Sequence, residues 1–399
     1  MNNTRWKGTT IVAIAASAMV LASCSKASDN TASSGGGASS AAAPAASAAG
    51  SNTAAASGSS AAGSAAVGSA AGSSAAGSSA AASSGAGSSA AAATAVTGTN
   101  VEPGCTPTTK TKPYIAIVSK GFQQQFWQSV KKGADQAASK LGATITFDGP
   151  ATEADIQPQL DMLKTDVSKK PDAVGFAALD SKAAEPILKQ VQAAKIPVIA
   201  FDSGVQSDIP LTTAATDNKA AAGEAAKHMA QLVGNKGTVG LVIHDQTSQT
   251  GLERRNGFIE WMKKNAPGIK LLEPQYGGGD PAKSADITKS IIAGNPDIAG
   301  IYGSNEGSAA GVVQGVKESG KKSIKIVGFD SGQAQISAIT DGLEAGAITQ
   351  NPIGIGEQTV TAAMLALKCK GLPTTIDTGY YWYDKTNITD PKIAPLLYK

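Results

Sequence analysis

Short apolar runs alternate with helix-type patterns along most of the chain from residue 112 onward. The apolar runs end in polar turn residues, which is typical of strands buried in a parallel sheet. Between them, apolar residues recur three or four positions apart, as one face of a helix requires. We predict strands or extended segments at 114–118, 144–147, 173–176, 197–201, 211–215, 239–243, 269–272, 298–302, 324–329, 347–349 and 379–383. We predict helices at 126–141, 156–167, 183–194, 218–233, 252–264, 283–292, 308–318, 334–341 and 356–368.

This alternation predicts the fold class. Strands separated by helices of this length form βαβ units with parallel sheets and right-handed crossovers. The pattern falls into two series of the same kind, and the second begins with the strand at 239–243. Residues 101–399 are long enough for two lobes of roughly 150 residues each. The sequence therefore predicts an α/β protein with two doubly wound parallel-sheet lobes.

The first 23 residues have the pattern of a secretory signal peptide. Arg5 and Lys7 precede an apolar stretch at 9–20, which is too short to span a bilayer well. Leu-Ala-Ser-Cys at 21–24 resembles the lipobox of bacterial lipoproteins, which implies cleavage before Cys24 and lipidation of that residue. An ordinary signal peptide followed by a chance cysteine is the alternative. Because more than one acyl chain makes a stable anchor, we expect an extracytoplasmic protein held at the cell membrane.

Residues 24–110 are predicted to form a tether. From 27 to 100 the chain is almost entirely Ala, Ser and Gly, and no aromatic residue occurs between Trp6 and Tyr114. Such a segment cannot bury enough apolar surface to offset the entropy of ordering it. A flexible chain of this kind spans on the order of 45–50 Å on average.

Composition excludes several classes of function. The net charge is +3, and the Lys and Arg residues are scattered, so nothing indicates nucleic-acid binding. Metal-ligand clusters and a phosphate-binding Gly-Lys-Ser/Thr loop are both absent from the sequence, so we expect neither a metal nor a cofactor. His244, Asp245 and Ser248 could be mistaken for part of a catalytic triad, but no nucleophile-elbow context surrounds them.

Two cysteines remain in the exported part of the chain. Cys105 lies before the first predicted strand, and Cys369 follows the last predicted helix. Cysteines of an exported domain can pair. A disulfide between these two and a pair of free thiols are both open from the sequence.

The tetrapeptide Phe-Asp-Ser-Gly occurs twice, at 201–204 and at 329–332. Each copy closes an apolar run that we predict to be a strand. The residue after such a strand lies at the carboxyl edge of the sheet, where open α/β folds bind their ligands. Asp202 and Asp330 are therefore candidate ligand-binding carboxylates, one in each predicted lobe.

Residues 112–383 resemble the type I periplasmic binding proteins, the ribose- and galactose-type receptors of ABC importers, in five segments that occur in the family's order. The resemblance implies a three-strand hinge between the lobes. It also implies that residues 111–216 plus 351–378 form the first lobe and 217–350 plus 379–399 the second.

The resemblance implies a ligand-binding set. In the segment 118–127, Ser119 matches a polar position, and Phe126 and Trp127 match aromatics that stack on a sugar ring, although either could instead be a core residue. The loop is one residue longer than in ribose receptors, which leaves open which of Gln123, Gln124 and Gln125 faces the cleft. The remaining matches are Asp202, Ser203, Arg254 of an Arg-x-x-Gly-Phe pattern, Asn305, Asp330 and Gln350.

Some positions depart from the family. Ser203 stands where ribose-type receptors have an arginine, which argues against ribose and makes this position a candidate for specificity. Tyr276 lies near a position where many relatives have a stacking aromatic, and it could replace that residue. Asp202 could alternatively be a cap or turn residue.

The resemblance implies a monomer that captures a sugar, polyol or related molecule by cleft closure and delivers it to an ABC permease, without catalysis. The alternative is a sensory receptor that presents its ligand to a signalling partner. A LacI-type regulator shares the fold but would need a DNA-binding headpiece where this chain has a signal and a tether. An extracytoplasmic hydrolase would have to turn its ligand over.

Overall fold

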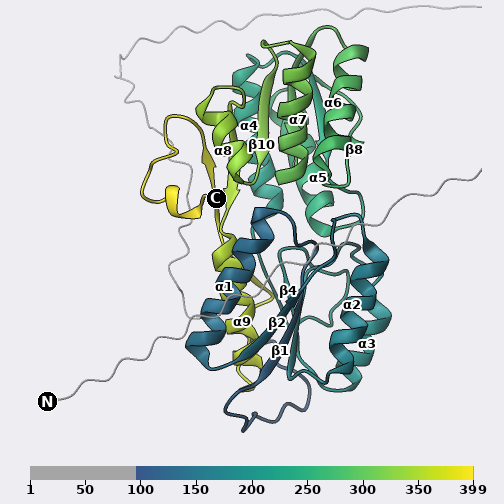
Figure 1. Ribbon diagram of the computed structural model, residues 1–399, viewed down its shortest axis with the longest axis vertical. Coiled ribbons are helices and arrows are strands. Elements are labelled where there is room, and N and C mark those ends of the chain that lie inside the picture. The colour runs from purple at the N-terminus through teal and green to yellow at the C-terminus, as the bar shows by residue number, and fades with distance from the viewer. Residues whose placement is uncertain (1–95, 399) are drawn as a thin grey trace, which may run out of the picture. The chain divides into compact units, whose positions relative to one another are not determined.

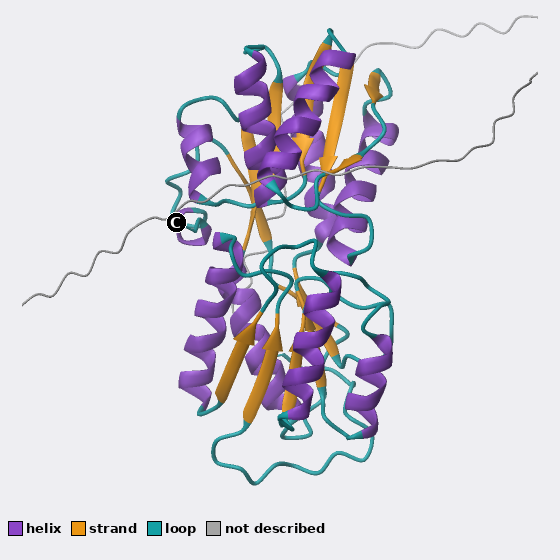
Figure 2. Cartoon of the chain, turned by 45° about the vertical axis from the view of Figure 1, so that its right-hand side comes forward, coloured by secondary structure: helices purple, strands orange, loops and turns teal. Residues whose placement is uncertain are grey.

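The computed structural model describes residues 96–398, which form two α/β lobes (Figure 1). Both lobes consist of a sheet with helices on its two faces (Figure 2). The predicted two-lobed fold is confirmed. The predicted signal peptide, Cys24 and most of the predicted tether lie outside the described residues.

The first lobe contains six parallel strands in the order β12-β5-β4-β3-β1-β2. They are β1 Tyr114–Val118, β2 Thr144–Asp148, β3 Ala173–Phe176, β4 Val198–Phe201, β5 Thr212–Ala215 and β12 Thr375–Asp377. One core packs helices α1 Gln125–Leu141 and α9 Pro352–Ala366 against the sheet, and the other packs α2 Ile156–Ser168 and α3 Glu185–Ala193. Gly133 and Gly356 allow α1 and α9 to approach closely, because a Cβ at either position would meet the partner helix's backbone.

The second lobe has the strand order β13-β11-β10-β9-β6-β7, with β8 paired to β6. All pairs are parallel except β11 with β13, which is antiparallel. The strands are β6 Gly237–Ile243, β7 Ile269–Leu271, β8 Gln275–Tyr276, β9 Ile298–Gly303, β10 Lys325–Phe329, β11 Gly346–Gln350 and β13 Tyr380–Tyr383. The helices are α4 Asn218–Leu232, α5 Gln249–Asn265, α6 Pro281–Gly294, α7 Glu306–Ser319, α8 Gln333–Thr340 and the 3₁₀ turn η1 Ala394–Leu396.

The chain passes between the sheets at three places: after β5, after β11 and between β12 and β13. Two of these segments are hydrogen-bonded side by side, since the Thr216 hydroxyl donates to the Gly379 carbonyl at 3.3 Å. The short strands β8 and β12 were not predicted, because neither has an apolar run long enough to stand out in the sequence.

The predicted tether boundary at residue 110 is wrong. Asn100 forms a β-bridge with Leu372, and its side-chain amide donates to the Leu211 carbonyl at 3.0 Å. Cys105 and Cys369 form a disulfide, with their Cα atoms 5.8 Å apart. Backbone pairing and this crosslink hold the segment against the first lobe.

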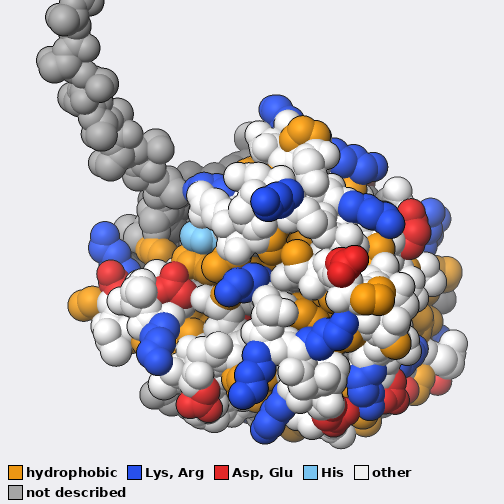
Figure 3. Space-filling model, turned by 90° about the horizontal axis from the view of Figure 1, so that it is seen from above, with side chains coloured by type: hydrophobic (Ala, Val, Ile, Leu, Met, Phe, Trp, Pro, Cys, Tyr) orange, Lys and Arg blue, Asp and Glu red, His pale blue; other side chains and the backbone are white. Residues whose placement is uncertain are grey.

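Basic side chains are dispersed over the outer surface shown in Figure 3. Seen from above, the face in Figure 3 has many Lys and Arg side chains dispersed among neutral ones. Several lysines lie in the last turns of helices, including Lys263 and Lys264 of α5 and Lys317 of α7, where they complement the helix dipole. Within residues 96–398, no helix has the length and apolar character needed to cross a membrane.

Candidate functional site

The two Phe-Asp-Ser-Gly segments have the same local structure in the two lobes. Asp202 follows β4 with φ +53°, and Asp330 follows β10 with φ +81°. The backbone N–H of each donates to the neighbouring strand, Asp202 to the Ala214 carbonyl and Asp330 to the Ile348 carbonyl. Positive φ is unfavourable for most residues other than glycine, and aspartate tolerates it better than most. Both carboxylates thereby lie at the carboxyl edges of their sheets, as predicted.

A small cavity between the lobes, with a volume of about 10 Å³, contains both carboxylates in its wall. Every lining side chain except that of Gln124 is buried. The first lobe contributes Lys120, Gln124, Phe126, Trp127, Glu153 and Asp202; the second contributes His244, Thr250, Arg254, Asn305, Asp330 and Gln350. Seven of the nine residues predicted to bind ligand are in this list.

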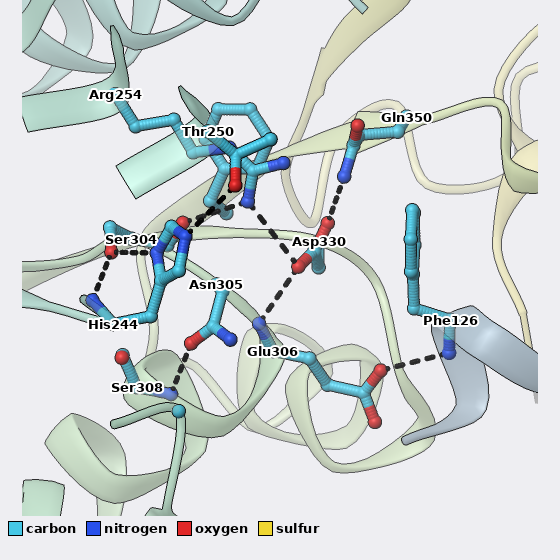
Figure 4. Close-up of polar contacts among 12 residues, drawn as sticks. Phe126, His244, Thr250, Arg254, Ser304, Asn305, Glu306, Ser308, Asp330 and Gln350 are labelled. Carbon is cyan, nitrogen blue, oxygen red and sulfur yellow. Dashed lines mark hydrogen bonds and ion pairs between the residues drawn. The ribbon is translucent and has the colours of Figure 1, made fainter. Parts of the chain in front are cut away.

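Arg254 and Asp330 form the centre of the second lobe's wall (Figure 4). The Arg254 guanidinium donates to Asn218 Oδ1 at 2.8 Å and to the Ser304 carbonyl at 2.9 Å. It lies 3.8 Å from Asp330 Oδ2 and stacks on the Phe329 ring, 3.8 Å from its centroid. These contacts fix its orientation, as a planar group with several donors requires.

Asp330 and Gln350 are joined directly. Gln350 Nε2 donates to Asp330 Oδ1 at 2.6 Å, and the backbone N–H of Glu306 donates to Asp330 Oδ2 at 2.8 Å. Gln350 Oε1 is buried and has no hydrogen-bond partner within residues 96–398. That oxygen is free to accept a hydrogen bond from a ligand.

Asp202 is the least satisfied carboxylate of the cavity. It is 4% exposed, and its side chain has no hydrogen bond to the residues that the structure describes. Burial raises the pKa of Asp202 to about 6, whereas Lys120 and Arg254 act to lower it. A buried carboxylate without partners is costly unless a ligand supplies the hydrogen bonds.

The aromatic wall comes from the start of α1. Phe126 and Trp127 contact each other edge to face, with ring centroids 4.9 Å apart. Both side chains line the cavity and are also members of the first lobe's core. Trp127 Nε1 donates to Glu153 Oε1 at 2.8 Å, and Asn305 Nδ2 donates to Glu153 Oε2 at 2.9 Å from the other lobe.

Glu306 links the lobes beside the cavity. Its carboxylate accepts hydrogen bonds from the backbone N–H groups of Gln125 and Phe126 at 3.2 and 3.1 Å, at the N-terminus of α1 (Figure 4). Burial, followed by the charge of nearby Asp330, raises the pKa of Glu306 to about 7. The lobes are therefore in a closed arrangement, held in part by a helix N-terminus on one lobe and a carboxylate on the other.

Two predicted residues do not reach the cavity. The Ser119 hydroxyl oxygen lies 2.8 Å from the Gly121 carbonyl and 3.1 Å from the Asp148 carbonyl, and its single O–H can donate to one of them. The Ser203 hydroxyl is buried, has no hydrogen-bond partner in the part of the chain that the structure describes, and is not part of the cavity wall. Both side chains are occupied with or enclosed by the first lobe, so the prediction that Ser203 sets specificity has no support from this geometry.

Other open points of the sequence are answered by position. Of the three glutamines in the loop, Gln124 lines the cavity, whereas Gln125 Oε1 accepts from the backbone of Gln333. Tyr276 does not line the cavity, because its hydroxyl is bound by Arg255 at 3.2 Å. Sequence reasoning missed Lys120, Glu153 and Glu306. Each is a charged residue in a loop or at the start of a helix near the strand ends. Charged residues are common at such positions on any protein surface, so the sequence did not distinguish these three.

His244 does not belong to a catalytic triad in this arrangement. Its Nδ1 lies 2.7 Å from the Ser304 hydroxyl, and the Ser248 hydroxyl donates to Asp245 rather than to His244. Burial lowers the pKa of His244 well below its ordinary value, although Asp245 acts to raise it. Within residues 96–398, no group of His, Cys, Asp and Glu side chains has the arrangement of a metal site.

A wider groove beside the hinge shares only Asp202 with the cavity. The further charged residues of its wall are Glu102, Asp208, Asp217, Glu253, Asp377 and Lys219. This one-sided set of acceptors lacks the balance of donors and acceptors found in the cavity. The cavity is therefore the candidate binding site.

Comparison with known proteins agrees with this geometry. A family model described as "Periplasmic binding protein domain" matches residues 115–371. The D-allose-binding periplasmic protein of Escherichia coli (strain K12) is 28% identical over 250 residues, which are 60% of this chain and 80% of that protein.

Two solved structures are more similar still in sequence. An ABC transporter solute binding protein from Agrobacterium vitis with bound D-fucose is 34% identical, with a TM-score of 0.69 over 71% of this chain and 100% of that one. A second from the same organism, bound to α-D-tagatopyranose, is 33% identical, with a TM-score of 0.69 over 72% and 99% of the two chains. The resemblance seen in the sequence is confirmed, and the chain belongs to the periplasmic binding protein domain family.

Proposed function

We propose that this protein binds one monosaccharide or closely related polyhydroxylated molecule between its lobes and delivers it to an ABC importer. The observation on which this rests is that Asp202 of one lobe and Asp330 of the other face the same cavity. A ligand bound to both holds the lobes together, so it binds the closed form better than the open form. That difference in affinity is what shifts the population toward closure.

The wall of the cavity suits a neutral, hydroxyl-rich ligand. Asp202 and Asp330 accept from hydroxyl groups, while Arg254 and Asn305 donate. Phe126 and Trp127 provide an apolar surface for a sugar ring. Three carboxylates against two cations leave no excess positive charge for an anionic substrate.

The relatives support a single sugar unit as the ligand. In the closed arrangement the cavity has a volume of about 10 Å³, which is room for about one water molecule, so the lobes or the lining side chains must move apart to admit a sugar. Two solved relatives have bound D-fucose and α-D-tagatopyranose, which are single sugar units. Neither sugar is thereby assigned to this chain, whose wall includes Lys120 and Glu153.

A thermal-shift panel tests the proposal. D-fucose, D-tagatose, D-allose, D-arabinose and D-ribose are compared with disaccharides and hexuronic acids. A ligand at 100 times its dissociation constant should stabilise the fold by about 2.7 kcal/mol. We expect a monosaccharide to raise the melting temperature and the disaccharides and acids to leave it unchanged. Stabilisation by none of the monosaccharides would refute the proposal.

Transport is tested separately from binding. In a strain lacking the gene, uptake of the labelled sugar should fall to background and return when the wild-type gene is restored. Normal uptake in the deletion strain would contradict the transport function and favour presentation of the ligand to a signalling partner.

We infer that the protein is held outside the cytoplasm by lipid on Cys24, which lies outside the described residues. The Leu-Ala-Ser-Cys sequence and the family's extracytoplasmic location support this inference. Wild-type protein should fractionate with membranes, whereas Cys24→Ala should not carry lipid.

We also propose that the protein releases its ligand unchanged, because Ser248 and His244 are not arranged for nucleophilic attack. Mass spectrometry of ligand recovered after prolonged incubation tests this.

A further inference from the structure

The peptide bond that follows Asp330 is held at both of its polar ends by tyrosines. The Tyr383 hydroxyl donates to the Asp330 carbonyl at 2.9 Å, and the Ser331 backbone N–H donates to the Tyr398 hydroxyl oxygen at 3.0 Å. All four residues are buried. Asp330 has φ +81°, and a residue other than glycine keeps such a conformation only where its surroundings hold it. The two hydroxyl groups are part of what holds it.

The equivalent turn of the first lobe has no such pair of tyrosines. There the backbone N–H of Ser203 donates to the Phe201 carbonyl. Within residues 96–398, no tyrosine hydroxyl is hydrogen-bonded to the peptide bond between Asp202 and Ser203. The Phe-Asp-Ser-Gly turn therefore forms without tyrosines, and Tyr383 and Tyr398 serve the second copy alone.

Tyr398 differs from Tyr383 because it joins the two lobes. The chain just before it belongs to the second lobe, where Ile393 is in a core cluster with Tyr383 and Ile339. The Tyr398 ring instead belongs to a core cluster of the first lobe. It contacts the Phe126 ring there, with centroids 6.0 Å apart and planes at 67°. Tyr398 thus packs against one lobe while its hydroxyl is bonded to the other.

This arrangement connects two parts of the cavity wall from behind. Phe126 supplies apolar surface on one lobe, and Asp330 supplies a carboxylate on the other. Because the contacts of Tyr398 are on different lobes, movement of the lobes relative to each other changes at least one of them. On the basis of the proposed function, we propose that Tyr398 is a positioning residue that keeps the Asp330 turn and the Phe126 ring in their ligand-binding arrangement and favours the closed form.

The test compares the wild type with Tyr398→Phe, Tyr398→Ala and the control Tyr381→Phe. Tyr398→Phe keeps the ring and leaves the buried Ser331 N–H without its acceptor, whereas Tyr398→Ala also removes the contact with Phe126. Tyr381 is a half-buried tyrosine of β13 in the same lobe, and its hydroxyl has no hydrogen bond to the described residues. The probe is the monosaccharide that binds best in the panel. Melting temperatures verify that each variant is folded, and Tyr398→Phe decides the question if Tyr398→Ala is not.

Titration calorimetry measures the affinity, and stopped-flow fluorescence measures the association and dissociation rates. We expect Tyr398→Phe to bind about tenfold more weakly and Tyr398→Ala about 100-fold more weakly. The loss should appear as faster dissociation, with association changed by about threefold or less, because the sugar enters the open form and is retained by the closed one. Tyr381→Phe should stay within about twofold of the wild type.

A residue that only packs the end of the chain would lower the melting temperature and leave the dissociation rate unchanged. Dissociation rates of the Tyr398 variants within twofold of the wild type would therefore overturn the inference, as would an equal loss in Tyr381→Phe. A loss that appears only in the association rate would overturn it too. A wild type that binds no monosaccharide would instead refute the proposed function.

Discussion

Replacement of Arg254 by alanine should weaken sugar binding more than replacement of its neighbour Arg255. Arg254 is 3% exposed and contacts Asn218, the Ser304 carbonyl and the Phe329 ring, with Asp330 3.8 Å away. Truncation to alanine removes the guanidinium N–H groups that would donate to the ligand. It also leaves the buried Asp330 carboxylate without its nearest cation.

The expected loss follows from these contacts. Breaking one partner of a buried charged pair costs about 2–5 kcal/mol, much of it from the charge left behind. At 1.4 kcal/mol for each factor of ten, this corresponds to a dissociation constant about 30- to 4,000-fold higher. Arg254→Lys keeps the charge near Asp330 but cannot contact Asn218 and Ser304 together, so an intermediate loss is expected.

Titration calorimetry with the best-binding monosaccharide measures these losses. Arg255→Ala is the matched control, because Arg255 is on the same helix and binds Tyr276 outside the cavity. We expect the control to remain within about twofold of the wild type. The reasoning would be refuted if Arg254→Ala also bound within twofold, or if both variants lost affinity equally.

Three further changes test other parts of the account. Cys105→Ser with Cys369→Ser should lower the free energy of unfolding by about 2–4 kcal/mol, and reductant should lower the wild type's melting temperature to match; no difference between oxidised and reduced protein would contradict the crosslink. Glu306→Ala should weaken sugar binding about tenfold by removing an inter-lobe contact, which calorimetry at pH 8 measures; an unchanged affinity would count against this contact. Burial raises the pKa of Glu344 to about 8 from an ordinary value near 4.5, so the protein's stability is greatest below pH 4.5 with respect to this group and falls as pH rises toward 8. Between pH 4.5 and pH 8, the free energy of unfolding of Glu344→Gln measured with urea should rise relative to that of the wild type by about 4 kcal/mol. Parallel pH profiles of the two proteins would contradict this.

The sequence predicted the parts of the site that depend on local pattern. An apolar run followed by Phe-Asp-Ser-Gly specifies both a buried strand and the polar residue at its end, so Asp202 and Asp330 could be placed without coordinates. Arg254 and Asn305 were found by matching family segments, and both line the cavity.

Residues that depend on the meeting of distant segments were not predictable in this way. Glu153 belongs to the site because it bonds Trp127 and Asn305, and no local pattern indicates that the three come together. Lys120 resembles a solvated loop lysine until the second lobe covers it. Asn100 adjoins a low-complexity segment, so its pairing with Leu372 could not be inferred from composition.

The central claim is that one sugar molecule is held by carboxylates from both lobes at once. Calorimetric titration of the wild type, Asp202→Asn and Asp330→Asn with the same monosaccharide tests it most directly. We predict one binding site per chain in the wild type and a loss of about 30-fold or more in each variant, because either change removes a charge-assisted acceptor from the same ligand. Two independent sites in the wild type, or full affinity in either variant, would contradict the account.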